Sequence, residues 1–503
     1  MVAMPASRDR VRLRPRVLAL GLVVAASLSA ACGSGSSLPD DAPNVLLITV
    51  DTLRYDHLGF AGYGRDTSPN IDALAERGVS FERAYAPSPW TLPSMASIHT
   101  GLYPSSHTLQ RPKASIPLEA TTLAEALSVV GYRTDAIVAN PIVHPRFGHS
   151  QGFDSFDTED AKGHDHISTP GITARAKALL ADYADGDERF FLSLLYFDPH
   201  YDWLGHGLGF APERAGRITG EESIEELREL AETTGLTDEE IAQLVARYDE
   251  EIAFTDAGIG ELLDELERLG LADNTIVVFV ADHGEEFLEH GWLGHTRFLY
   301  EGMIHVPLVV ADPRRRIGQG QSVQLPVSTV SVMPTILELV GLDPERYAPD
   351  EPSLAQLVTE PALEGSIELN GLDPRHDGWV FSEVDFVPAD LAMHDKIAHL
   401  EAVVGSPLKL IRDKRTGEVE VYEPSEDPGE LRDRAPEWAL PTGERLEVGN
   451  PDHNGASQLQ GLASMLDEWQ AACAKRALTP HEGHLSDEEM DELNKLGYLD
   501  TGD

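Results

Sequence analysis

Side chains that could bind a divalent cation follow two apolar segments of the sequence. Asp51 ends the segment PNVLLITVD (43–51), and Asp282 and His283 lie near the end of NTIVVFVADHGEE (274–286). Two carboxylates and an imidazole suit a hard-to-borderline metal ion. Because calcium prefers oxygen ligands alone, the histidine favours zinc or manganese, with calcium as the remaining alternative. The competing interpretation is structural: Asp51 caps a helix, and the Asp-His-Gly run makes a turn.

The segment SPWTLPSMASIHTG (88–101) contains a candidate nucleophile. Pro93 in the first turn and Gly101 at the end predict a short helix over 93–99 with a left-handed exit. Thr91 falls just ahead of this helix, where its hydroxyl would meet the backbone N–H groups of the first turn. Thr91 is therefore either a helix cap or the group that attacks a substrate.

Histidine is concentrated in two further segments, DPHYDWLGHGLG (198–209) and EHGWLGHTRFLYE (289–301). Such density is uncommon outside functional sites, although a single histidine is more often a satisfied core or surface residue. We expect functional roles for His200 and His295, whereas a structural role explains His290 more readily.

One pair in the first of these segments has a spacing that suits a second cation. Asp202 and His206 stand four residues apart, with a glycine between them. Together with His295 they could hold a second metal ion. Alternatively, both are ordinary polar residues of a loop.

The elements that must position these residues alternate between strands and helices. Strand-length apolar runs occupy 43–51, the segment that ends at Asn140, 189–200, 274–286 and 306–313. Runs of this kind are typical of strands buried on both faces of a parallel sheet. The polar residues that end four of them are Asp51, Asn140, Asp198 to His200, and Asp282 to His283. In a doubly wound sheet such ends meet at the ligand-binding edge, so we predict one site there.

Helical periodicity separates the strands. It covers 68–81, where Gly78 is the expected stop, the acidic stretch EEIAFTDAGIGELLDELERLG (250–270), and 334–342. We interpret the charges of 250–270 as a solvated helix face. The predicted fold class is α/β, with a large, mixed, mostly parallel sheet sandwiched by helices and a small C-terminal antiparallel α+β subdomain.

The predicted organisation of the chain has six parts. They are a signal peptide at 1–31, a linker at 32–42, the main α/β domain at 43–345, a connecting segment at 346–377, the antiparallel subdomain at 378–435, and a loop and short-helical tail at 436–503.

The N-terminus has the pattern of an export signal. An arginine-rich start precedes an apolar run over 17–31, which is too short for a confident membrane span, and Cys32 follows in front of a Gly/Ser linker. This resembles a bacterial lipoprotein signal and implies a periplasmic or outer-surface protein attached to a membrane through lipidated Cys32. The alternative is a cleaved signal of a soluble exported protein. Since Cys473 is the only other cysteine, at most one disulfide can form.

The formal net charge of −46 argues against nucleic acid or an anionic membrane surface as a partner. An anionic substrate would also have to enter against this field. A metal ion or local cations must therefore hold such a substrate.

Five segments together resemble the sulfatases of the alkaline-phosphatase-like superfamily. The resemblance runs in the expected order over about residues 43–430. It rests on PNVLLITVDTLRYDHLG, SPWTLPSMASIHTGLYPSSH, YDEEIAFTDAGIGELLDELERLGLADNTIVVFVADHGEE, LYEGMIHVPLVV and LKLIRDKRTGEVEVYEPSEDPGE. It implies that 43–345 is a catalytic domain and that the chain hydrolyses esters.

The resemblance breaks at the nucleophile. Sulfatases carry a cysteine or serine that is oxidised to formylglycine, followed by x-Pro-Ser-Arg, whereas this chain has Thr91 at that position and Met95 at the arginine. The family's Gly-Lys-Trp-His segment is also absent, because the matching strand ends in Ala139-Asn140, and Thr52 replaces the second acidic residue. No formylglycine is therefore expected.

The remaining features resemble the phosphodiesterase and phosphonate-hydrolase branches of the same superfamily. These use an unmodified threonine beside a metal, an Asp-His pair, and a strand-end asparagine that holds a phosphoryl oxygen. Their Asp-x-x-Gly-His element for a second zinc matches Asp202 to His206 in spacing, although the same segment also resembles the sulfatase Pro-His element at His200.

The resemblance and the residues together predict a mechanism. Asp51, Asp282 and His283 would bind the metal beside a nucleophilic Thr91, and His295 would protonate the leaving group. Asn140 and His200 would bind substrate oxygens. The substrate would be a small-molecule, glycan or lipid ester of sulfuric, phosphoric or phosphonic acid. The alternative is a catalytically inactive surface binding protein. The mechanism requires the threonine hydroxyl within roughly 5 Å of the cation position.

Overall fold

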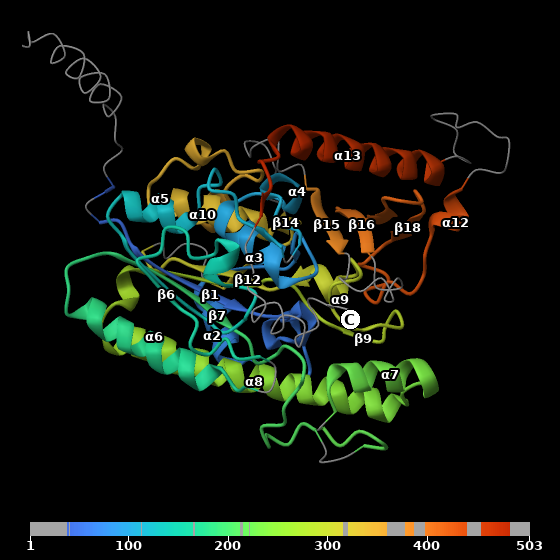
Figure 1. Cartoon of the computed structure of the whole chain (residues 1–503), viewed down its shortest axis with the longest axis horizontal. Helices are drawn as coiled ribbons and strands as arrows, with labels where there is room; N and C mark the ends of the chain where they lie inside the picture. The colour runs from blue at the N-terminus through green and yellow to red at the C-terminus, as the bar shows by residue number, and fades with distance from the viewer. Residues whose placement is uncertain are drawn as a thin grey trace, which may run out of the picture.

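The central sheet lies in the middle of the molecule, with the strand order β13-β2-β12-β8-β1-β7-β5-β6 among the described residues (Figure 1). Strands β8, β1, β7, β5 and β6 pair in parallel, as do β13 and β2, and β12 runs antiparallel to both β8 and β2. The predicted large, mixed, mostly parallel sheet is therefore confirmed. The strands are β1 (Asn44–Val50), β2 (Val79–Phe81), β5 (Arg133–Val138), β6 (Ser155–Asp157), β7 (Phe190–Tyr196), β8 (Thr275–Ala281), β12 (Leu308–Ala311) and β13 (Gln321–Val323).

The computed structural model describes residues 38–39, 41–111, 113–163, 166–211, 215–220, 222–314, 320–359, 378–386, 398–439 and 454–482. The predicted signal peptide at 1–31, the lipidated Cys32, and residues 440–453 and 483–503 of the predicted tail lie outside these residues. None of the helices in the described ranges combines the length and the apolar character that crossing a membrane requires.

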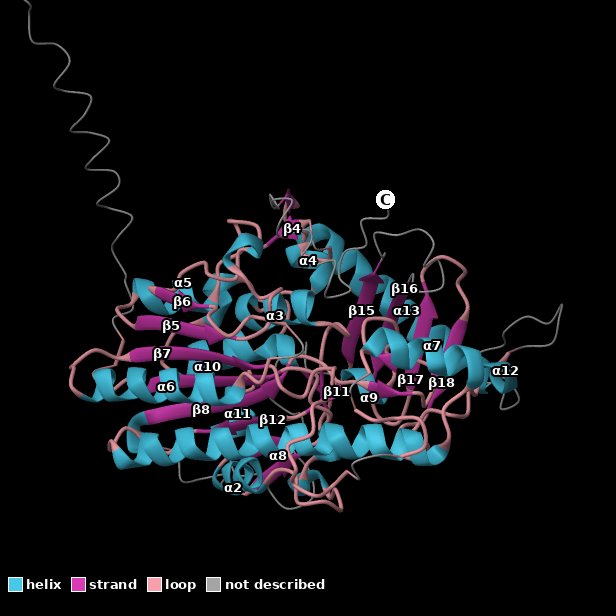
Figure 2. Ribbon diagram, turned by 60° about the horizontal axis from the view of Figure 1, so that its bottom comes forward, coloured by secondary structure: helices cyan, strands magenta, loops and turns pink. Residues whose placement is uncertain are grey.

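Helices cover both faces of the sheet because its strands are apolar on both sides. In β1, Leu46 and Ile48 pack into one core while Val45 and Leu47 pack into the other. The first core is closed by α2 (Pro69–Arg77), α6 (Thr169–Ala184) and α8 (Asp238–Arg268), and the second by α3 (Thr91–Thr100), α5 (Leu123–Val129) and α10 (Val332–Leu339). Figure 1 shows α6 and α8 on one side of the sheet and α5 and α10 on the other, and Figure 2 views the molecule with α6 and α8 turned toward the front.

In helix α8, some of the charged side chains that were predicted to face solvent are buried. It begins at a capping box in which Thr237 and Glu240 exchange hydrogen bonds. Asp249, Glu250 and Glu251 are at most 2% exposed, so this part of the helix is not a solvated face. Their partners come from loops far away in the sequence, which helical periodicity cannot indicate.

A separate four-stranded sheet forms the C-terminal part, in the antiparallel order β15-β16-β17-β18. Its strands are β15 (Val380–Phe386), β16 (Ala398–Val404), β17 (Lys409–Asp413) and β18 (Val419–Tyr422). The predicted C-terminal antiparallel sheet is confirmed. The long helix α13 (Asn454–Arg476) covers it, with Leu466 packed against Val403 and Leu410. This helix replaces part of the loop and short helices expected for the tail.

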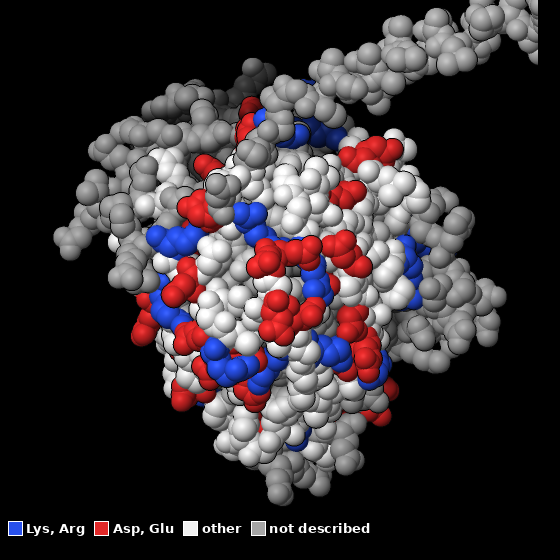
Figure 3. All heavy atoms as spheres, turned by 90° about the vertical axis from the view of Figure 1, so that its left-hand side faces the viewer, with Lys and Arg blue, Asp and Glu red and all other residues white. Residues whose placement is uncertain are grey.

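The remaining described elements are short. They are β3 (Ala84–Tyr85), β4 (Ala114–Ser115), β9 (Glu286–Phe287), β10 (Leu293–Gly294), β11 (His305–Val306), β14 (Val327–Ser328), β19 (His481–Glu482), α4 (Pro104–His107), α7 (Ile224–Thr234), α9 (Glu301–Ile304), α11 (Ala355–Thr359) and α12 (Ala435–Trp438). On the face turned to the left in Figure 1, acidic and basic side chains are intermixed (Figure 3).

Candidate metal centre and active site

The strand order brings the predicted site residues to one edge of the sheet. Strands β8, β1, β7 and β5 are neighbours, and Val50 at the end of β1 pairs with Ala281 of β8 and Tyr196 of β7. Asp51, Asn140 and Asp282 follow these strands, so their side chains gather at the carboxyl edge.

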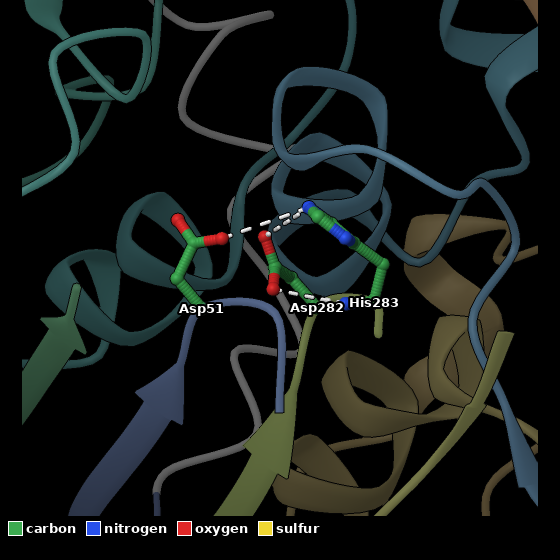
Figure 4. Close-up of side chains that lie close together, drawn as sticks. All are labelled: Asp51, Asp282 and His283. Carbon is green, nitrogen blue, oxygen red and sulfur yellow. Dashed lines mark hydrogen bonds and ion pairs between the residues drawn. The ribbon is translucent and has the colours of Figure 1, made fainter. Parts of the chain in front are cut away.

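Asp51, Asp282 and His283 form a compact group of ligand atoms (Figure 4). Nε2 of His283 lies 3.6 Å from Oδ1 of Asp51 and 3.5 Å from Oδ2 of Asp282. All three side chains are completely buried. Among the described residues, no other group of three or more histidine, cysteine, aspartate or glutamate side chains has its ligand atoms so close together.

The electrostatics of this group call for a cation. Burial raises the pKa of Asp51 well above its usual value, and the neighbouring carboxylate of Asp282 raises it further. Burial also raises the pKa of Asp282 to about 7 and lowers the pKa of His283. Oδ2 of Asp282 accepts no hydrogen bond from the described residues, although it is buried. A divalent ion would compensate both carboxylates and use that oxygen, so the donor set fits a metal.

Thr91 is the first residue of α3 and not the residue ahead of it. Trp90 is the N-cap, and no side chain caps this helix. The Thr91 hydroxyl instead lies 3.4 and 3.5 Å from the carboxylate oxygens of Asp51 and 3.2 Å from Nε2 of His283. These are separations expected between atoms that share one cation, and they meet the 5 Å requirement. The predicted left-handed exit of the helix is present at Gly101, where φ is 68°.

Asn140 joins the same group from the end of β5. Its Nδ2 donates to Oδ2 of Asp51 at 2.5 Å and lies 3.3 Å from the Thr91 hydroxyl. Its Oδ1 accepts the backbone N–H of Ile142, which fixes the amide with its NH₂ toward the carboxylate. Asn140 therefore belongs to the same group of side chains as Asp51 and Thr91.

Two histidines extend the site away from the carboxylates. The ring of His295 lies 4.7 Å from that of His283 and 4.7 Å from that of His200, measured between centroids. Nδ1 of His295 lies 3.0 Å from Oε1 of Glu285. Both side chains of that pair are completely buried. Burial raises the pKa of Glu285 well above its usual value. Glu285 therefore orients His295, a role that sequence reasoning missed although Glu285 follows the Asp-His-Gly run directly.

The predicted second cation site does not form among the described residues. His206 donates from Nε2 to Glu251 at 2.5 Å, and Oδ1 of Asp202 accepts the backbone N–H of Ile224. The two are held by different elements, and neither belongs to a cluster with His295. The Asp-x-x-Gly-His spacing was misleading because this segment is a loop, in which residues four apart need not share a face.

His290 has the structural role expected of it. Its Nδ1 lies 2.9 Å from Glu286, and its ring stacks on Tyr300 with 3.5 Å between centroids. Its Nε2 lies 3.2 Å from the carbonyl of Glu430, so it connects the main domain to the C-terminal part.

Comparisons with known proteins agree with this architecture. A sequence model described as sulfatase matches residues 43–342. An ulvan-active sulfatase of Formosa agariphila is 26% identical over 359 residues, which cover 65% of this chain and 67% of that protein. Human arylsulfatase A is 28% identical over 359 residues, or 59% of this chain and 64% of that protein.

Solved structures share the fold. The crystal structure of a phosphonate monoester hydrolase of Agrobacterium radiobacter aligns with a TM-score of 0.65 at 22% sequence identity. The alignment covers 86% of this chain and 96% of that one. At this level of identity the similarity establishes the fold alone.

Proposed function

The chain belongs to the sulfatase family, whose members hydrolyse esters, and we propose that it is a metal-dependent hydrolase of sulfuric, phosphoric or phosphonic esters with an unmodified Thr91 as nucleophile. One observation carries this proposal. The Thr91 hydroxyl lies 3.4 Å from Asp51 and 3.2 Å from His283, where it would share a cation with both. The start of a helix does not by itself require a threonine hydroxyl among buried carboxylates.

Asp51, Asp282 and His283 would hold the divalent metal, and we favour zinc or manganese because one ligand is an imidazole. When bound, the ion would lower the pKa of the Thr91 hydroxyl and polarise a substrate oxygen. Asn140 and His200 would bind the non-bridging oxygens. The positive end of α3, which begins at Thr91, would add to the stabilisation of the negative charge.

The first step forms a covalent intermediate. Oγ1 of Thr91, which would be deprotonated beside the cation, attacks the sulfur or phosphorus atom, and the bond to the ester oxygen breaks. His295, held by Glu285, donates a proton to the departing alcohol.

The second step releases the acid. Water attacks the intermediate and the bond to Oγ1 of Thr91 breaks, which returns the threonine to its starting, deprotonated state. Of the two protons of the water, one restores His295 and the other leaves the site with the oxyanion product.

The choice between sulfur and phosphorus rests on two residues. Thr91 replaces the residue that sulfatases convert to formylglycine, and Asn140 resembles the strand-end asparagine with which the phosphodiesterase-like branches hold a phosphoryl oxygen. By this resemblance, both residues favour a phosphorus ester. The family as a whole favours a sulfuric ester, so both classes belong in the substrate panel.

The test compares the same substitution at two threonines of α3. Thr91→Val removes the hydroxyl at the site, whereas Thr100→Val removes one that only bonds the carbonyl of Ala96 at 2.7 Å. The metal-loaded chain is assayed against sulfate monoesters, phosphate mono- and diesters, and phosphonate monoesters. We expect Thr91→Val to lower kcat at least about 1,000-fold and Thr100→Val to leave it nearly unchanged.

Two outcomes would overturn the proposal. Equal turnover by Thr91→Val and wild type would make the threonine a mere helix residue. No turnover of any ester by wild type with zinc, manganese or calcium would favour an inactive binding protein. Elemental analysis of the purified chain gives the metal and its stoichiometry, for which one ion per chain is expected from the single described cluster.

We also propose that the chain is exported and anchored through lipidated Cys32. The arginine-rich start, the apolar run and the position of Cys32 before a Gly/Ser linker support this. Cys32→Ala should move the protein from the membrane fraction to the soluble periplasmic fraction. Equal membrane association of both forms would contradict the anchor.

A further inference from the structure

The guanidinium group of Arg228 is held in a fixed position by its contacts. Its Nε donates to the carbonyl of Leu293 at 2.8 Å. Its central carbon lies 4.8 Å from the ring centroid of Trp292 and 5.4 Å from that of Tyr201. These contacts join α7, which carries Arg228, to the hairpin of β9 and β10 (Figure 1). A guanidinium stacked on aromatic rings in this way is pre-organised for a ligand.

The charge of Arg228 is not compensated by a direct ion pair with any described residue, although the chain contains 85 acidic residues against 39 lysines and arginines. Among the described residues, the hydrogen bond of its Nε is the one that the guanidinium donates, and the side chain is half-buried. The two NH₂ groups are therefore left to donate to a ligand. A guanidinium presents such donors in a fork that matches a carboxylate, a sulfate or a phosphate.

The ring of Tyr201 connects Arg228 to the active site. It stacks on the ring of His295, with 5.0 Å between centroids and 21° between planes, and His295 in turn lies 4.7 Å from His283. A side chain at Gly294, the residue before His295, would meet Nη2 of Arg228 at 2.2 Å, so the guanidinium lies directly against this backbone. The contacts therefore lead from a metal ligand, through the histidine proposed to protonate the leaving group, to Arg228.

Arg297 brings a second positive charge to the same place. It follows His295 by two residues, and its guanidinium carbon lies 5.0 Å from the ring centroid of Trp292 and 5.2 Å from that of Phe298. Two guanidinium groups therefore contact one indole ring. Because the net charge of the chain is −46, this local positive potential is the kind of feature that an anionic ligand would need.

We propose that Arg228 binds an anionic group carried by the alcohol part of the substrate. The inference rests on the proposed hydrolysis, in which His295 protonates the departing alcohol. It names the class of that alcohol, which would bear its own carboxylate, sulfate or phosphate. The reacting ester group would be held at the metal by Asn140 and His200, so Arg228 recognises the second charge and determines specificity without acting on the reacting atoms.

A role confined to the neighbouring side chains is the competing interpretation. Burial raises the pKa of Glu285, and the positive charge of Arg228 opposes this rise. If Arg228 acted only through Glu285, which orients His295, its loss would affect every substrate to the same degree. A subsite predicts instead that its loss affects only substrates with a charged alcohol.

The test uses matched pairs of para-nitrophenyl esters of the acid that the metal-loaded wild type hydrolyses fastest. One member of each pair carries a carboxylate on the ring and the other carries the neutral carboxamide, attached directly in one pair and through a short methylene chain in the second. We expect wild type to prefer the carboxylate in at least one pair. Arg228→Gln should lower kcat/KM for that ester at least about 10-fold and leave its carboxamide partner nearly unchanged. Arg228→Lys keeps the charge without the fork and should lie in between.

Arg133 provides a matched control. Its guanidinium carbon lies 4.9 Å from the ring centroid of Tyr183, so it also stacks on a tyrosine. It begins β5, however, and Asn140 follows the other end of this strand, which places Arg133 at the edge of the sheet away from the active site. Arg133→Gln should keep the wild-type preference between the two esters.

The preference is the ratio of two kcat/KM values, which does not depend on the fraction of the chain that is folded, so a destabilised variant still gives an answer. Equal kcat/KM for both members of each pair in wild type, or a wild-type ratio in Arg228→Gln, would overturn the subsite and leave the proposed hydrolysis intact. Failure of the proposed hydrolysis is recognised separately, because wild type would then turn over neither member of any pair, and the subsite would fall with it.

Discussion

The Thr91 hydroxyl lies 3.2 Å from Nε2 of His283, although the two residues are 192 positions apart in the chain. Nδ1 of His283 lies 2.9 Å from the carbonyl of Gly284, so it carries the ring hydrogen and Nε2 presents its lone pair to the site. A side chain at Gly284 would meet the carbonyl oxygen of Gly302 at 2.0 Å. The backbone after β8 therefore fixes one tautomer of the His283 imidazole beside the Thr91 hydroxyl.

A covalent adduct on Thr91 should follow from this arrangement. Because the hydroxyl is the nearest nucleophile to the metal ligands, rapid quenching during turnover should leave a phospho or sulfo group on the peptide that contains it. Mass spectrometry of digested, acid-quenched enzyme checks this. Thr91→Val should show no adduct, and an adduct on any other residue would contradict the assignment.

Metal binding should stabilise the fold through Asp282. At 100 times the dissociation constant, zinc or manganese should raise the unfolding free energy by about 2.7 kcal/mol, visible as a higher melting temperature. Asp282→Asn should lose this shift and should make the metal-free chain more stable, since it removes one of two buried like charges.

A buried aspartate outside the site gives the control for that measurement. Asp256 accepts the backbone N–H groups of Asn70 and Ile71 at the start of α2. Asp256→Asn should lower stability but keep the metal-induced shift. If Asp282→Asn kept the shift as well, the carboxylate would not be a ligand.

Much of the fold follows from the sequence because the central strands are buried on both faces. Long apolar runs fit such strands, and a polar residue such as Asp51 or Asn140 marks where the strand has ended. Parallel pairing places these ends at one edge, so the neighbourhood of the site could be inferred without side-chain positions.

The polar contacts of α8 could not be inferred in this way. Asp249 pairs with His57 and Arg65, and Glu251 pairs with His206, all from distant loops. A carboxylate on a helix looks the same in the sequence whether it faces water or a loop that folds over it. The failure of the second-metal prediction has the same origin, because Glu251 takes the position beside His206 that a cation would have needed.

Stability should fall in mild acid because of a buried histidine on α3. His99 is 2% exposed, neither of its ring nitrogens has a hydrogen-bond partner among the described residues, and burial lowers its pKa to about 4. The unfolded chain binds a proton at this residue below about pH 6.5, and the folded chain rejects it until about pH 4. The contribution of neutral His99 to stability is therefore complete above about pH 6.5. As the pH falls below this value the free energy of unfolding decreases, by about 3 kcal/mol at pH 4.

Replacing His99 should flatten this pH dependence. Urea unfolding of His99→Phe and wild type at equal metal concentration should converge in stability as the pH drops from about 7 to about 4. The exposed His481 is the control, and His481→Gln should retain the wild-type slope. A parallel decline of His99→Phe and wild type would show that this residue does not report on acid stability.

Lys409 should stabilise the contact between the C-terminal sheet and the main domain. Its ammonium group is completely buried and lies 3.0 Å from Glu301 of the main domain and 3.0 Å from Glu430. Burial opposes ionisation of Glu301, but Lys409 outweighs it and lowers the pKa of that carboxyl to about 2. Lys409→Met would leave buried carboxylates without their cation, so the unfolding free energy should fall by about 3–5 kcal/mol. Glu430→Gln in the same chain should restore part of this free energy.

Lys414 provides the control. Lys414→Met, at a more exposed lysine 3.8 Å from Glu383, should lower the unfolding free energy by less than about 1 kcal/mol. Equal losses at the two lysines in denaturant unfolding would mean that the buried ion pairs contribute no more than a surface contact.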